Sequence, residues 1–77
     1  MDERAKVIID LIESEMSKQE IKDMINLGGD RTLTFTSGLK IDLKGLHNIG
    51  MLEAIIHEQG QPSHLRLFSK MHFGLFH

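Results

Sequence analysis

The sequence has no cysteine among its 77 residues. Disulfide bonds, thiolate zinc sites and cysteine nucleophiles are therefore excluded. A domain of this size buries only about 60% of the surface of its unfolded chain, and disulfides, metals or self-association commonly supply the missing stability. Because the first two are lacking here, we expect self-association, in the form of a homodimer.

Tryptophan and tyrosine are also absent, and every apolar run is short. The first absence argues against a surface that stacks on nucleic-acid bases. The second predicts that no segment crosses a membrane, and the N-terminus does not resemble a signal peptide. We therefore expect a cytoplasmic protein without membrane association, formed as a single domain over residues 1–77.

Charge is distributed unevenly along the chain. Residues 1–30 carry four basic and eight acidic side chains, a net charge of −4, whereas residues 31–77 carry five basic and three acidic ones, a net charge of +2. An acidic N-terminal part is repelled by phosphate, since nucleic-acid affinity depends largely on lysine and arginine. It suits a basic protein surface better, although such charges also simply keep an outer face soluble.

The clearest local signal lies at residues 16–21. Ser17 is a favoured N-cap residue and Glu20 follows three positions later, which forms a capping box. Met16 and Ile21 flank this pair at the spacing of a hydrophobic staple. A helix is therefore predicted from Lys18 to about residue 27, where two glycines end it.

A first helix is predicted from about residue 2 or 3 to residue 14. Its apolar residues recur at helical spacing and form an arc of about 200°, more than one neighbour usually covers. We expect this helix to contact two partners, one of which belongs to another chain; burial in its own core is the alternative. The two helices make an N-terminal helical hairpin over residues 2–29.

A β-hairpin follows within residues 30–77. Leu33 and Phe35 alternate with threonines, and Leu39, Ile41 and Leu43 alternate with charged residues. A three-residue loop at 36–38 pairs Phe35 with Leu39 and Leu33 with Ile41, so that the apolar side chains share one face.

Asn48 is interpreted as the cap of a third helix, over about residues 49–59. Four apolar residues then face inward, and Gly60 and Pro62 end the helix: Ile49, Leu52, Ile55 and Ile56. The alternation in the tail, residues 63–77, favours a strand that joins the hairpin, with a helix as the alternative. The predicted class is α+β with a small antiparallel sheet, in the order α-α-β-β-α-β.

No pattern in the sequence predicts an enzyme, a cofactor or a metal site. The cap explains Ser17 without a nucleophilic role. Glu53 and His57 stand four apart on the predicted third helix, where such pairs usually lie in solvent. His64 and His72 share a face of the predicted tail strand, but two imidazoles alone make a poor zinc site.

Two non-enzymatic functions remain, and both start from the helical hairpin. In the first, which is the alternative, residues 17–26 form the second helix of a helix-turn-helix, and three side chains face the major groove of DNA: Lys18, Gln19 and Lys22. The acidic hairpin, with Glu20 and Asp23 on that same helix, argues against this alternative.

In the second, residues 8–25 resemble the helical hairpin of the Sin-type antirepressors of Bacillus. The matching stretches are Ile8-Ile9-Asp10-Leu11-Ile12 and Met16-Ser17-Lys18-Gln19-Glu20-Ile21-Lys22. This chain lacks the tryptophan usual in the first helix of that family, and its turn is one residue shorter. The resemblance implies a small regulatory or inhibitory protein that associates with a protein partner, such as a repressor, through six residues: Ile8, Leu11, Ile12, Ile21, Met24 and Ile25.

Overall fold

The computed structural model describes residues 2–76 and has two helices, a four-stranded antiparallel sheet and a short 3-10 helix. The elements are, in order, α1 (Glu3–Glu15), α2 (Lys18–Leu27), β1 (Gly29–Thr34), β2 (Lys40–Leu46), β3 (Met51–His57), β4 (His64–Ser69) and η1 (Lys70–Phe73). The strands follow one another across the sheet in the order β1-β2-β3-β4. The class is therefore α+β, as predicted.

Both helices begin at capping residues that the sequence displays. The Ala5 amide donates to the Asp2 carboxylate at 2.7 Å and starts α1. At α2, the Glu20 amide donates to the Ser17 hydroxyl, and the Ser17 amide donates to the Glu20 carboxylate. The predicted capping box is confirmed. Each of these bonds satisfies an amide that has no partner within its helix.

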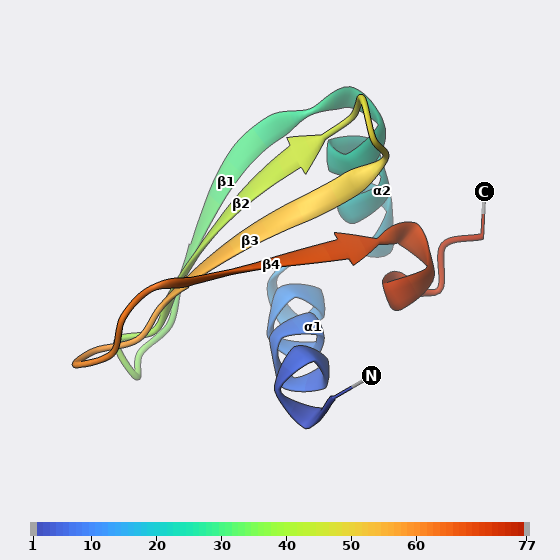
Figure 1. Ribbon diagram of the computed structural model, residues 1–77. Helices are drawn as coiled ribbons and strands as arrows, with labels where there is room; N and C mark the ends of the chain where they lie inside the picture. Colours follow the sequence, from blue (N-terminus) through green and yellow to red (C-terminus); the bar gives the residue numbers. More distant parts are fainter. Residues whose placement is uncertain (1, 77) are drawn as a thin grey trace.

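The helical hairpin covers one face of the sheet and forms a two-layer domain (Figure 1). Strand residues that face the helices are buried, and their neighbours in sequence lie on the opposite, open face. The buried side chains of both layers form one core: Ala5, Ile8, Ile9, Ile12, Met16, Ile21, Ile25, Leu33, Ile41, Leu43, Leu52, Ala54, Ile56, Phe68 and Phe73.

Gly45 marks the place where α2 comes closest to the sheet. A Cβ at this position would stand 1.9 Å from the Met24 carbonyl oxygen. Glycine is required here by the closeness of the two backbones, because any side chain would push the end of α2 away from β2.

The predicted register of the β1–β2 hairpin is confirmed. Leu33 pairs with Ile41, and the Phe35 amide donates to the Leu39 carbonyl at 2.9 Å. Gly38 has a φ of 93°, in the left-handed region that a three-residue loop requires at this position.

The predicted third helix is wrong, because these residues form β3. Leu52, Ala54 and Ile56 alternate with half-buried residues and face the helices, and Ile49, which the helix would have buried, is exposed in the β2–β3 turn. A short apolar run of this kind fits both the period of a helix and that of a strand. The strand is formed because the backbone groups at the edge of β2 would otherwise be unpaired.

The tail divides into two elements. Residues 64–69 form β4, which pairs with β3 rather than with the β1–β2 hairpin, and the chain then turns into η1 instead of continuing as a strand. Phe73 of η1 is buried against Phe68, with ring centroids 5.9 Å apart in an edge-on arrangement. The Phe73 carbonyl accepts a hydrogen bond from the Lys18 ammonium, which ties the tail to α2.

Candidate functional site

β4 forms one edge of the sheet, and its outward backbone groups follow from the register. The Phe35–Leu39 pair is hydrogen-bonded, and bonded pairs alternate along an antiparallel ladder. The same alternation can be followed through the registers of β1–β2, β2–β3 and β3–β4. It follows that the backbone groups of residues 64, 66 and 68 of β4 are hydrogen-bonded to β3. Leu65, Leu67 and Ser69 therefore direct their amide and carbonyl groups away from the sheet.

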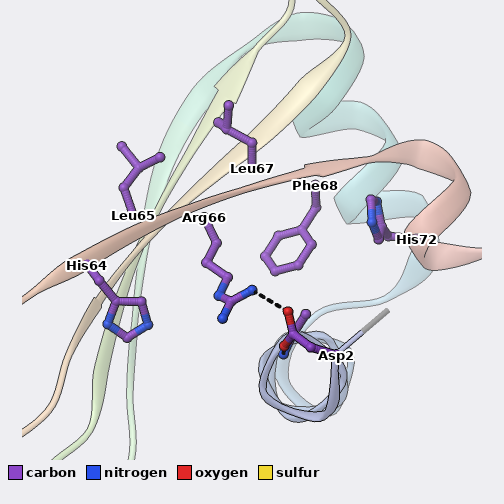
Figure 2. Close-up of a pocket in the computed structure, with 8 residues that line it drawn as sticks. Asp2, His64, Leu65, Arg66, Leu67, Phe68 and His72 are labelled. Carbon is purple, nitrogen blue, oxygen red and sulfur yellow. Dashed lines mark hydrogen bonds and ion pairs between the residues drawn. The ribbon is translucent and has the colours of Figure 1, made fainter.

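A groove runs along this edge (Figure 2). It has a volume of about 400 Å³, and its lining includes five consecutive residues of β4, residues 64–68. The opposite wall is formed by the start of α1, with Asp2 and Ala5, and His72 of η1 closes one end. A groove parallel to a strand edge has the shape that an additional extended chain would occupy.

Side chains of β4 alternate between the groove's inner wall and the open face of the sheet. Figure 2 shows His64, Arg66 and Phe68 on the side of α1, and Leu65 and Leu67 on the opposite side. Arg66 donates to the second oxygen of Asp2 at 3.0 Å. The Ala5 amide, followed by Arg66, lowers the pKa of Asp2, so this carboxylate stays ionised beside the arginine.

The two histidines of the groove do not form the shared strand face that the sequence suggested. His64 belongs to β4 and His72 to η1. The Ser69 amide donates to Nδ1 of His72 at 2.9 Å, whereas Nε2 of His64 is buried without a hydrogen-bond partner. Within residues 2–76, no cluster of three histidine or acidic side chains is placed to hold a metal ion.

Beside the groove, the open face of the sheet carries a short apolar strip formed by Ile55, Leu65 and Leu67, with Glu53 of β3 opposite Leu67 on the same face. Ile55 pairs with Leu65 across β3 and β4, and Leu67 stands on the same face. Leu65 is 53% exposed and Leu67 is 45% exposed. The same two residues therefore present both uncharged side chains and outward backbone groups to solvent.

The structure places most of the predicted partner-binding residues inside the core. Ile8, Ile12, Ile21 and Ile25 are buried, so they are unavailable to another protein while the domain keeps this packing. Leu11 and Met24 are partly buried at the margin of the core. The wide apolar arc of α1 is thus covered largely by residues of the same chain.

The residues of the alternative DNA-binding surface are engaged locally. The Lys18 ammonium donates to Glu13 at 3.0 Å as well as to the Phe73 carbonyl. Gln19 donates to Asp23 at 2.8 Å, and Lys22 lies half-buried on the same helix. An acidic partner on two of the three residues disfavours contact with phosphate.

A hydrogen-bonded chain of side chains on the open face was not foreseen from the sequence. His57 bonds to Asp42 through Nε2 at 2.8 Å and to Ser63 through Nδ1 at 2.7 Å, and Thr32 donates to Asp42 at 2.8 Å. Thr32 first, and then His57, lowers the pKa of Asp42. Only the strand register reveals this chain, because sequence spacing had paired His57 with Glu53 on a helix. The chain of bonds fastens the β3–β4 loop to the sheet.

Comparisons with protein-family models, curated proteins and solved structures found no match to this chain. Across the described residues 2–76, none of the helices has the length and apolar character needed to span a membrane. The geometry of the site is therefore the basis for a functional proposal.

Proposed function

We propose that this protein is a small regulatory protein that acts by association with another polypeptide, which adds as a strand at the edge of β4. The observation that carries the proposal is the coincidence of three features at one place: the outward backbone groups of Leu65 and Leu67, the groove beside them and the adjoining apolar strip. Backbone hydrogen bonds provide affinity in this mode of binding, and alternate side chains provide specificity.

The helical hairpin has a supporting role in this proposal. Its buried isoleucines hold the sheet, and the start of α1 forms the second wall of the groove. The hairpin-to-hairpin association of the antirepressors would require those isoleucines to face a partner instead. We therefore keep the proposal of a regulatory protein that binds another protein, and we propose the edge of β4, in place of the hairpin, as its contact surface.

Selection of binders from a displayed library of random extended peptides tests the proposal. We expect selected peptides to alternate apolar and polar residues and to bind the wild-type chain. Their binding should be lost in Leu67→Pro, where the outward amide is replaced by a ring, and kept in Thr32→Pro on the β1 edge. Peptides that bind Leu67→Pro as well as wild type, or a selection that yields none, would contradict the proposal that a different polypeptide adds as a strand at β4.

A further inference from the structure

We infer that a second copy of this chain is a partner of the β4 edge: two β4 strands pair antiparallel about a two-fold axis at Leu67. This inference rests on the proposed function, since it names an occupant of the same site. Two four-stranded sheets then join into one of eight strands. An isologous contact of this kind is self-complementary, because each copy offers the same surface to the other.

The hydrogen-bonding groups of β4 fit this arrangement. With the axis at Leu67, Leu67 pairs with its symmetry equivalent, and Leu65 of each copy pairs with Ser69 of the other. Leu65 and Leu67 direct both backbone groups outward, whereas Ser69 offers only its carbonyl, because its amide is bonded to Nδ1 of His72. Ser69 is still extended, with φ −96° and ψ 171°. Leu67 therefore exchanges two bonds with its equivalent, and the Leu65 amide of each copy donates to the Ser69 carbonyl of the other, before η1 turns the chain away.

Other registers are less favourable. An axis at Arg66 also allows four bonds, in two pairs of Leu65 with Leu67, but it places the guanidinium groups of the two copies directly opposite one another. An axis at Leu65 leaves one bonded pair within β4, since that strand begins at His64. With the axis at Leu67, Arg66 instead stands opposite Phe68 of the second copy.

The chemistry of the strip favours a second copy over a charged partner. On the open face, the β4 side chains at and beside the axis are Leu65, Leu67 and Ser69, all uncharged, and Leu67 meets an identical leucine. The nearest charge on that face, Glu53, lies one strand inward on β3. The β1 edge differs in this respect. Its outward residues are Asp30, Thr32 and Thr34, and the Thr32 hydroxyl is already bonded to Asp42. Charged and polar residues are typical of edges that resist pairing.

Sedimentation equilibrium and amide hydrogen exchange, measured on the full chain from low micromolar to millimolar concentration, test the inference. We expect a reversible monomer–dimer equilibrium. As dimer forms, exchange at the amides of Leu65 and Leu67 should slow, because these amides become hydrogen-bonded. The amides of Thr32 and Thr34 on the β1 edge should exchange at unchanged rates and serve as the internal control.

Two matched variants locate the contact. Proline at Leu67 or at Thr32 removes an amide that is not hydrogen-bonded to a neighbouring strand of the same chain. Circular dichroism should therefore show the wild-type fold for both variants. Leu67→Pro should be monomeric, whereas Thr32→Pro should dimerise as wild type does. Leu67→Lys is a second variant that keeps the amide, and it should also be monomeric, since two lysines would meet at the axis.

A chain that remains monomeric at millimolar concentration overturns the inference, as does a dimer that Leu67→Lys leaves intact. A monomer that still binds selected peptides at β4 overturns only the second copy as partner and leaves the proposed function standing. A dimer that depends on Leu67, without binding of any selected peptide, supports the inference and contradicts the broader regulatory proposal.

Discussion

Glu20 links three parts of the fold through a single carboxylate. One oxygen accepts from the Ser17 amide in the capping box, and the other accepts from Arg31 of β1 at 2.7 Å. These contacts join the turn between the helices, the first turn of α2 and the edge of the sheet. The Ser17 amide, followed by Arg31, lowers the pKa of Glu20 from its ordinary value of 4.5 to about 2.

At this residue we predict an acid-dependent loss of stability that Glu20→Gln abolishes. Because the folded-state pKa is below the ordinary value, ionised Glu20 stabilises the fold fully above pH 4.5, and its contribution disappears as the pH falls toward about 2. Urea unfolding should show wild type more stable than Glu20→Gln at neutral pH and equal to it near pH 2. Asp10→Asn, exposed on α1, is the control and should follow wild type; a pH-independent difference for Glu20→Gln would contradict the prediction.

At the scale of elements, α1 is divided between a buried face and an exposed one. Ile12 is fully buried, whereas Val7 is 55% exposed. The apolar arc had suggested that part of α1 contacts another chain, but the sheet of the same chain covers most of that arc. α1 therefore belongs to the core along its buried face, from Ala5 to Ile12, and its start also forms a wall of the groove.

For α1 we predict that Ile12→Ala lowers the free energy of unfolding by about 2–5 kcal/mol, because it leaves a cavity between the helices and the sheet. Val7→Ala should change it by less than about 0.5 kcal/mol. Chemical denaturation measures both values. If Ile12→Ala kept wild-type stability, Ile12 would lie outside the core.

The strand β3 shows where local pattern was insufficient at this scale. Ile49, Leu52, Ile55 and Ile56 have helical spacing, and a turn at Asn48 resembles a helix start. The same segment also places Leu52, Ala54 and Ile56 on one face of a strand. Over seven residues, the apolar pattern fits both the helical period and the two-residue period of a strand. The strand forms because the edge of β2 would otherwise have unpaired backbone groups.

At the scale of the whole molecule, the helical hairpin and the meander depend on each other. The buried isoleucines of α1 and α2 contact the sheet, and neither layer can hide its apolar face alone. Pairing of two copies along β4 would extend the sheet without changing these layers.

We therefore predict that a peptide of residues 1–28 is mostly unfolded in water. Two short helices without a sheet to cover have little stability of their own, in spite of their caps. Far-ultraviolet circular dichroism should show little helix for the peptide, and a single cooperative unfolding transition for the full chain. A stably helical peptide would mean that the hairpin folds independently of the sheet.

The sequence by itself determined the features that depend on contacts within a few residues. The capping box at Ser17 and Glu20, the bounds of α2 and the three-residue loop before Leu39 could all be predicted, because helix caps and tight turns are satisfied locally. The α+β class followed from the same signals.

Only the tertiary structure decided which apolar residues are covered and which backbone groups are free. β3 is a strand because β2 needs a partner, and the isoleucines of α1 are core because the sheet lies against them. That β4 is an edge strand follows from the order of the strands in the sheet, which the sequence does not show. Each of these outcomes depends on residues distant in the chain, whose positions local spacing does not encode.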